Sequence, residues 1–307
     1  MHLVRLSFAL LLATPLCAQV QPIMSTPMAA DPLAGPLVEN PLASGPVMVG
    51  PIADTAAPIN PALLAQPGGD ERFQPEVGQA GKDVIWVPTP DSLVTAMLTV
   101  ADVKPGDYVV DLGSGDGRIA IAAGRDFGAR AHGIEYNPDM VALARRNARR
   151  AGVADRVSFA NGDIFASDFS DATVVTLYLL PALNERLRPI LLKMKPGTRI
   201  LSNSFLMGDW EPERTISTDD ATGYFWIVPA KAAGRWAFEV GDERFLADFT
   251  QKYQFLTPAR AGPIRDGRLK GSNVAFTRAN GQSIEGEVDG DSMAGRGWTA
   301  SRVKPAN

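Results

Sequence analysis

Short apolar runs alternate with longer amphipathic segments through the middle of the chain. Each run has four or five residues, a length typical of strands buried on both faces of a sheet, and each amphipathic segment repeats its apolar residues at helical spacing. The runs predict strands at 108–112, 131–135, 156–160, 173–177 and 199–202, and the segments predict helices at 91–102, 118–127, 138–151 and 181–194. This order predicts an α/β fold, in which a doubly wound, mostly parallel sheet carries helices on both faces.

Strand-like segments replace this alternation beyond residue 213. Two of them, within 214–228, flank the turn 219–223 and are expected to pair antiparallel at the edge of the sheet. Further short segments, separated by turn sequences such as Ala279-Asn280-Gly281, predict strands at 235–240, 244–255, 273–277, 283–288 and 297–302. We therefore predict an α/β domain over residues 73–230 and a small β-rich domain over residues 231–307, either an antiparallel sheet or a partial barrel.

The first 18 residues have the features of a secretory signal peptide. Arg5 precedes the apolar run 6–12, and Leu16-Cys17-Ala18 offers a cleavage site. Because the run is too short to cross a bilayer, we expect no transmembrane span there. The expected location of the protein is the periplasm, or the cytoplasm if the signal is not used.

Residues 19–72 form a proline-rich segment. A proline recurs every four or five residues between Pro22 and Pro51, and the sequences PLAGP and PLASGP nearly repeat one another. Proline fixes φ and removes a backbone donor, so neither a helix nor a central strand is expected. We predict an extended, mostly disordered linker, for which the role of a plain spacer is favoured over the binding of a partner.

Charge and composition narrow the classes of function. The formal net charge of the 307 residues is −4, so no overall basic field attracts nucleic acid, which is not expected as a partner. Two histidines and one cysteine exclude a zinc finger, an iron–sulfur site and a disulfide scaffold, and no metal site is expected. His132 is interpreted as structural. Four arginines at i, i+4 spacing favour a solvated helix face over a nucleic-acid patch; they are Arg145, Arg146, Arg149 and Arg150.

A glycine-rich loop follows the first predicted strand. It reads Asp111-Leu112-Gly113-Ser114-Gly115-Asp116-Gly117-Arg118. A dinucleotide fingerprint would need glycine at position 118, so a nicotinamide oxidoreductase is disfavoured. Asp111 and Asp116 would repel a pyrophosphate, but they suit a cofactor that bears an amino group and a sulfonium.

Acidic and amide side chains follow the next two strands. Glu135 ends the second strand, where such an acid accepts hydrogen bonds from both hydroxyls of a ribose. Asn161 and Asp163 follow the third strand, where a carboxamide and a carboxylate are placed to read an adenine amino group. Thr89, before the first helix, either closes over the carboxylate of the cofactor or simply begins the helix. Ligands of doubly wound sheets bind at this edge, so these residues form a candidate nucleoside site.

Residues 86–210 resemble the class I, seven-stranded S-adenosylmethionine-dependent methyltransferases, whose sheet is Rossmann-like. The chain is most similar to a bacterial group with VPTP at 87–90, DLGSGDGR at 111–118 and VVTLYLLP at 174–181, and that group is similar in turn to small protein-lysine methyltransferases. The resemblance implies S-adenosylmethionine as cofactor, a sheet completed by the two strands within 214–228, and a protein lysine as acceptor. The residues expected at the cofactor are Thr89, Asp111, Gly113, Ser114, Gly115, Gly117, Glu135 and Asp163.

The segment after the fourth strand is where this superfamily usually holds the methyl acceptor. It reads Leu177-Tyr178-Leu179-Leu180-Pro181, and it lacks the Asn/Asp-Pro-Pro-aromatic signature of amide and adenine methylators. A lysine must be neutral to attack a sulfonium methyl group, so its site needs a proton acceptor or an apolar channel. Tyr178 is the candidate catalytic residue, as the lining of that channel; the alternative is a half-buried strand tyrosine.

Two hypotheses of function follow. The leading one is an S-adenosylmethionine-dependent methyltransferase that acts on a protein lysine. The second is an exported, non-catalytic nucleoside-binding or envelope-interaction module on the same scaffold, because a signal peptide directs the chain to a compartment where S-adenosylmethionine is not expected. Five residues favour the enzyme, since a scaffold freed from the cofactor need not keep them; they are Asp111, Gly113, Gly115, Gly117 and Glu135.

Overall fold

The computed structural model describes residues 73–79, 81–82 and 85–304. The predicted signal peptide (1–18) and the predicted linker (19–72) lie outside the described residues. Within this part of the chain, no helix combines the length and the apolar character that a membrane span requires.

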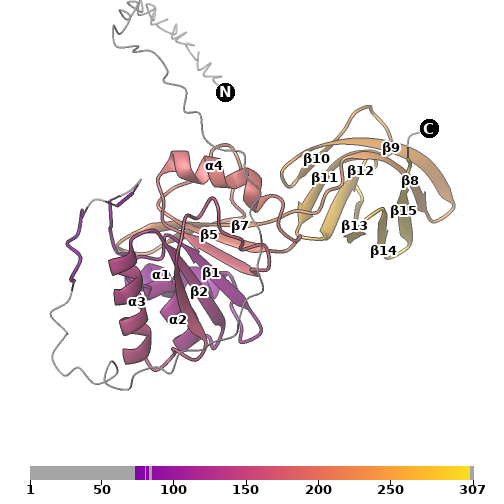
Figure 1. The fold of residues 1–307 in the computed structure, drawn as a ribbon. Coiled ribbons are helices and arrows are strands. Elements are labelled where there is room, and N and C mark those ends of the chain that lie inside the picture. Colours follow the sequence, from indigo (N-terminus) through magenta and orange to yellow (C-terminus); the bar gives the residue numbers. More distant parts are fainter. Residues whose placement is uncertain (1–72, 80, 83–84, 305–307) are drawn as a thin grey trace, which may run out of the picture. The chain divides into compact units, whose positions relative to one another are not determined.

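The strands between residues 108 and 227 form a seven-stranded sheet (Figure 1). Its strands are β1 (Tyr108–Leu112), β2 (Arg130–Glu135), β3 (Val157–Asn161), β4 (Val174–Leu177), β5 (Arg199–Asn203), β6 (Arg214–Ser217) and β7 (Thr222–Ile227). They lie in the order β3-β2-β1-β4-β5-β7-β6. The first five are parallel, whereas β7 runs antiparallel to β5 and β6 antiparallel to β7. This sheet confirms the predicted α/β class, and the chain order reverses between β1 and β4, where such folds bind ligands.

Four helices cover the sheet: α1 (Asp91–Val100), α2 (Arg118–Asp126), α3 (Pro138–Arg150) and α4 (Pro181–Leu191). Local signals explain where two of them begin. Gly117 precedes α2 with φ +84°, a left-handed conformation that glycine adopts readily. Asn137 precedes α3, and its side chain accepts a hydrogen bond from the backbone N–H of Asp139, while Pro138 occupies the first helical position.

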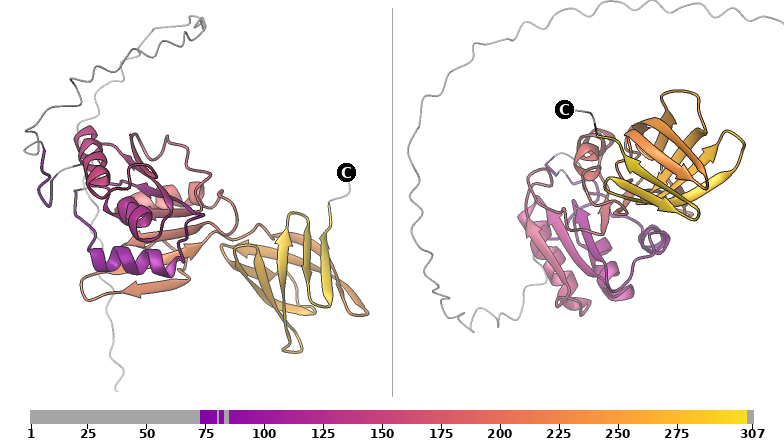
Figure 2. Two further views of the ribbon diagram at one scale, coloured as in Figure 1. Left: turned by 90° about the horizontal axis from the view of Figure 1, so that it is seen from below. Right: turned by 90° about the vertical axis from the view of Figure 1, so that its right-hand side faces the viewer.

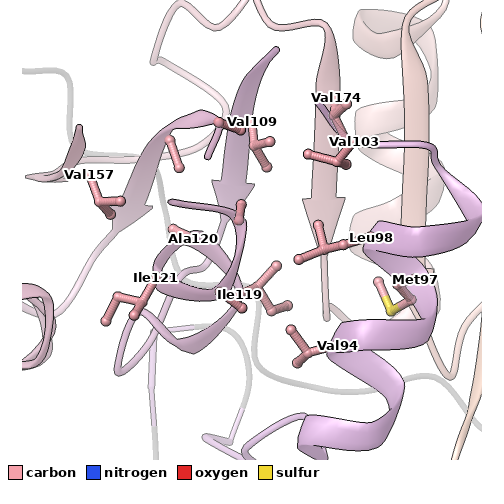
Figure 3. Close-up of a cluster of buried hydrophobic side chains, with 14 of the residues drawn as sticks. Val94, Met97, Leu98, Val103, Val109, Ile119, Ala120, Ile121, Val157 and Val174 are labelled. Atoms are coloured by element: carbon pink, nitrogen blue, oxygen red, sulfur yellow. The ribbon is translucent and has the colours of Figure 1, made fainter. Parts of the chain in front are cut away.

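Successive residues of the central strand point into two different cores. Val109 belongs to the cluster that α1, α2 and α3 cover, together with Leu98 and Ile119 (Figure 3). Val110 belongs to the cluster on the other face, together with Leu187 of α4. A strand covered on both faces needs apolar residues at every position rather than at alternate ones. This burial explains why the sequence of β1 reads as a continuous apolar run.

A closed antiparallel barrel follows the sheet in the chain (Figure 2). Its strands are β8 (Gly234–Val240), β9 (Glu243–Lys252), β10 (Phe255–Pro258), β11 (Ile264–Lys270), β12 (Asn273–Arg278), β13 (Ser283–Asp289), β14 (Ser292–Gly295) and β15 (Trp298–Arg302). Buried aromatic rings fill its interior, among them Trp236, Phe238, Phe249, Phe276 and Trp298. The C-terminal antiparallel region is thus confirmed, and its eight strands close on themselves.

Three details of the barrel differ from the sequence prediction. The single strand predicted at 244–255 is wrong, because the chain turns at Tyr253, whose φ is +53°, and β9 and β10 pair across that turn. The strands β11 and β14 were not predicted. Only Ile264, Gly267 and Leu269 of β11 are buried, and β14 has four residues, so neither carries a clear apolar alternation. Pairing with both neighbours stabilises such strands in a closed barrel.

Candidate cofactor and acceptor site

A cavity of about 240 Å³ lies at the carboxyl ends of the parallel strands. Its walls come from the loops after β1, β2, β3, β4 and β5, and from residues between Gln79 and Thr89 that precede α1. Of the eight residues expected at the cofactor and the candidate catalytic Tyr178, all but Gly117 line this one cavity: Thr89, Asp111, Gly113, Ser114, Gly115, Glu135, Asp163 and Tyr178. Residues spread over ninety positions of sequence therefore meet at one edge of the sheet.

The glycine loop turns sharply over the end of β1. The backbone N–H groups of Gly113 and Ser114 both donate to the carbonyl oxygen of Ile134, at 2.8 and 3.1 Å. A Cβ atom on Gly115 would lie 2.8 Å from Nε1 of Trp86, so only glycine leaves room for that indole. The hydroxyl oxygen of Ser114 is buried and has no hydrogen-bond partner among the described residues.

Gly117 does not line the cavity. A Cβ atom there would lie 2.5 Å from the ring of Phe159 and 3.0 Å from Cβ of Ala144. Its φ of +84° also places it in the left-handed region. The structure therefore gives this third glycine of the loop a packing role at the start of α2, where the sequence prediction placed it among the cofactor residues.

Asp111 is the most deeply buried acid of the cavity, with 2% of its surface exposed. The hydroxyl of Thr176 in β4 donates to its Oδ1 at 2.7 Å. Burial raises the pKa of Asp111 to about 7; the hydrogen bond from Thr176 opposes that rise, and the nearby carboxylates of Asp116 and Glu135 add to it. A buried carboxylate without a cationic partner among its contacts is suited to the ammonium group of a ligand.

Glu135 is held by two backbone amides. Its Oε2 accepts from the N–H of Gly115 at 2.9 Å, and its Oε1 accepts from the N–H of Asn137 at 2.9 Å. A carboxylate oxygen accepts more than one hydrogen bond, so each retains capacity for a hydroxyl donor. The side chain is therefore oriented in advance for a diol, as the sequence analysis expected of a ribose.

Asp163 follows β3 and also lines the cavity. Its Oδ2 accepts from Nζ of Lys82 at 2.8 Å and its Oδ1 from the N–H of Phe165 at 2.9 Å. These hydrogen bonds lower the pKa of Asp163 below its usual value, so it is ionised at neutral pH. The expectation for Asn161 was wrong: its amide donates to the carbonyl oxygens of Glu135 and Tyr136, and it does not line the cavity.

Thr89 and Tyr178 both line the cavity. Thr89 is buried, precedes α1 and lines the cavity, and its hydroxyl accepts from Nδ2 of Asn203 at 3.1 Å. Tyr178 is half-buried and lines the cavity as well. Its ring stacks on that of Phe205, with centroids 6.3 Å apart and an interplanar angle of 29°.

Sequence reasoning missed three aromatic residues of the wall: Trp86, Tyr136 and Phe205. Trp86 directly precedes the VPTP segment and Tyr136 directly follows Glu135, so proximity to a motif was a usable signal for both. Phe205 follows β5, a strand to which no motif was assigned. Its place in the wall depends on β5 lying beside β4 in the sheet.

Polar residues set aside in the sequence analysis have local partners. Nδ1 of His132 lies 2.8 Å from the hydroxyl oxygen of Ser158. Arg145 donates through Nε and Nη2 to the carbonyl oxygen of Phe159. Within the described ranges, no group of three or more His, Cys, Asp and Glu side chains is placed to hold a metal ion.

The doubly wound sheet, its glycine loop and the acids at its strand ends define a class I S-adenosylmethionine-dependent methyltransferase. Residues 111–214 match the sequence model of the ANTKMT methyltransferase domain. A protein-lysine N-methyltransferase of Saccharolobus islandicus (strain REY15A) is 42% identical over 47% of this chain and 94% of that relative. The adenine nucleotide translocase lysine N-methyltransferase of Mus musculus is 33% identical over 56% of this chain and 72% of that relative.

Among solved structures, an RNA methyltransferase from Salinibacter ruber in complex with S-adenosyl-L-homocysteine is similar to this chain. It is 54% identical, covers 48% of this chain and 96% of its own, and has a TM-score of 0.47. By its relatives, the chain belongs to the ANTKMT methyltransferase family. The protein is an enzyme, and the alternative of a non-catalytic module is set aside.

The cavity fits the cofactor S-adenosylmethionine. Asp111 would hold its amino group, Glu135 its ribose hydroxyls and Asp163 its adenine amino group, since all three carboxylates line the cavity. The cofactor supplies a methyl group on a sulfonium, which is transferred by in-line displacement. The protein contributes position, charge and the exclusion of water.

We expect cofactor binding to depend on pH, because burial raises the pKa of Asp111. We expect S-adenosylhomocysteine to bind about tenfold more tightly at pH 8 than at pH 6, because a carboxyl with a pKa of about 7 must ionise to pair with the ligand's ammonium group. Calorimetric titration of the full chain at both pH values measures this ratio. Equal affinity at pH 6 and pH 8 would show that the charge of Asp111 does not take part in binding.

Proposed function

We propose that this enzyme methylates the side-chain nitrogen of lysine in a protein substrate. The observation that carries the proposal is the aromatic pair of Tyr178 and Phe205 in the cavity wall. Leu179, Leu180 and Leu183 line the cavity beside this pair, so this part of the wall is largely apolar. The two relatives above are both lysine N-methyltransferases, which supports the same substrate class.

An apolar, aromatic wall suits lysine at each stage of the reaction. Desolvation lowers the pKa of an ammonium group, so a lysine that enters is more readily neutral. The nitrogen lone pair then forms a bond to the methyl carbon, and the carbon–sulfur bond breaks with its electron pair returning to sulfur. The proton that the entering lysine loses passes to water before the attack, and the products are S-adenosylhomocysteine and a methylated ammonium cation. The faces of the two rings stabilise this cation.

The substrate class is tested by following the methyl group. The full chain is incubated with S-adenosylmethionine tritiated in the methyl group and, separately, with a protein extract and total RNA from the source cells. The labelled protein is then hydrolysed to amino acids. We expect label in Nε-methylated lysine. Label confined to RNA, or to any other amino acid, would overturn the proposal.

Phe205 is expected to matter to the acceptor and not to the cofactor. Phe205→Ala removes one ring of the pair, and we expect the rate of lysine methylation at subsaturating extract to fall about 30-fold, which corresponds to about 2 kcal/mol. The affinity for S-adenosylhomocysteine should change less than about threefold. Rate assays and calorimetry on the same preparations check both numbers.

Tyr178→Phe is the matched variant, because it keeps the ring stack and removes only the hydroxyl group. We expect its rate to fall less than about fivefold, since the ring rather than the hydroxyl contacts the acceptor. An unchanged rate in Phe205→Ala would show that the aromatic pair does not form part of the acceptor site. A larger loss in Tyr178→Phe than in Phe205→Ala would assign proton transfer to the hydroxyl group instead.

A further inference from the structure

The loop that carries Phe205 connects β5 to β6, and α4 holds it from one side. The side chain of Asn184 is fully buried, and its Nδ2 donates to the carbonyl oxygens of Phe205 and Leu206 at 3.2 Å each. One turn further along α4, Nη1 of Arg188 donates to the carbonyl oxygen of Met207 and to Oδ1 of Asp209, both at 2.8 Å. Four hydrogen bonds thus tie the loop to a helix of the sheet domain.

The barrel holds the same loop through the turn between β9 and β10. The hydroxyl of Tyr253 donates to Oδ1 of Asp209 at 2.6 Å, and its ring stacks on that of Trp210 at 5.8 Å and 23°. Gln254 uses both ends of its amide: Oε1 accepts from Nε1 of Trp210 at 3.0 Å, and Nε2 donates to the carbonyl oxygen of Glu211 at 2.9 Å. The loop therefore lies between α4 and this turn.

The contacts between this loop and the barrel are buried and hydrogen-bonded. Gln254 is 0% exposed and Trp210 is 2% exposed, so losing either partner would leave a buried polar group unsatisfied. Tyr253 adopts φ +53°, a conformation that a non-glycine residue keeps only where its surroundings enforce it. Hydrogen bonds from Tyr253 and Lys252 lower the pKa of Asp209 to about 2, so the carboxylate stays charged at any physiological pH.

We propose that Tyr253 and Gln254 are positioning residues for the methyl acceptor, and that the barrel serves the reaction by fixing the loop that carries Phe205. They contact neither cofactor nor acceptor wall directly; they act through Asp209 and Trp210, four and five residues beyond Phe205. The inference rests on the proposed function in one respect, namely that Phe205 faces the acceptor. The barrel then acts as a second support of the active-site wall.

Hydrogen–deuterium exchange tests the inference without an acceptor. In the full chain carrying Gln254→Ala, we expect amide exchange in the segment 203–210 to rise about tenfold, with exchange in the barrel strands unchanged. The affinity for S-adenosylhomocysteine should stay within about threefold, while lysine methylation falls about tenfold or more. Gln282→Ala is the matched control, because this exposed barrel glutamine lies in the turn between β12 and β13 and contacts Arg278.

A second variant covers the case in which Gln254→Ala fails to fold. Tyr253→Phe removes only the hydrogen bond to Asp209 and keeps the ring on Trp210, so we expect a smaller rise in exchange of about threefold, again confined to 203–210. Unchanged exchange in that segment, or a rise spread over the barrel strands, would overturn the inference. Failure of the lysine proposal alone would leave the exchange result intact, so the two outcomes are distinguishable.

Discussion

Asp111→Asn is expected to weaken the binding of S-adenosylhomocysteine at pH 8 by about 30- to 1,000-fold. Asparagine has nearly the same size and can still accept the hydrogen bond from Thr176, so the change removes charge and little else. Loss of one partner of a buried, hydrogen-bonded charge pair costs roughly 2–4 kcal/mol. Calorimetric titration of the full-length variant measures the loss, and the variant should no longer bind more weakly at pH 6 than at pH 8.

The same substitution should stabilise the ligand-free protein at pH 8. The folded-state pKa of Asp111, about 7, lies above its ordinary value of 3.8, so the folded state loses stability as the pH rises from about 4 to about 7. Removing the ionisable group removes this loss, and we expect the free energy of unfolding at pH 8 to rise by roughly 1–4 kcal/mol. Weaker binding together with a lower melting temperature would instead indicate damage to the fold.

Gly117→Ala is expected to lower the stability of the sheet domain by about 2–5 kcal/mol. The left-handed φ of +84° costs an alanine about 1–2 kcal/mol. The new Cβ would lie 2.5 Å from the ring of Phe159, so the packing of α2 against β3 must also shift, at about 1–3 kcal/mol. Thermal and urea denaturation of the full chain, followed at the transition of the sheet domain, measure the loss.

Gly106→Ala is the control for this substitution. A Cβ atom at Gly106 meets no heavy atom within 4 Å, and we expect a change within about 1 kcal/mol. The folded fraction of Gly117→Ala should bind S-adenosylhomocysteine nearly as the unmodified protein does, because Gly117 does not line the cavity. If Gly117→Ala lost affinity for S-adenosylhomocysteine while its stability was unchanged, Gly117 would have a role in cofactor binding after all.

The sequence predicted the structure of the sheet domain more completely than that of the barrel. The strands β1, β4 and β5 are buried on both faces, β2 and β3 are partly exposed, and the helices are buried on one face, so each of these elements carries a pattern that depends only on its own residues. Asp111, Glu135 and Asp163 were identifiable because each stands at the end of such a strand. The barrel was less readable. Its turn at Tyr253 is stabilised by Trp210 and Asp209, which lie more than 40 residues earlier in the chain. The residues next to Tyr253 therefore do not predict the turn.

Local pattern and local chemistry thus determined the α/β class, the glycine loop and the acids that line one edge of the sheet. The tertiary structure alone decided which residues complete the site. Phe205 faces Tyr178 because β5 pairs with β4, and the loop beyond it is held by Asn184 from α4 and by Gln254 from the barrel. A sequence motif indicates the chemistry of a residue and its place in its own strand, helix or loop. The neighbours that orient it come from distant segments, which only the packing of sheet, helix and barrel brings together.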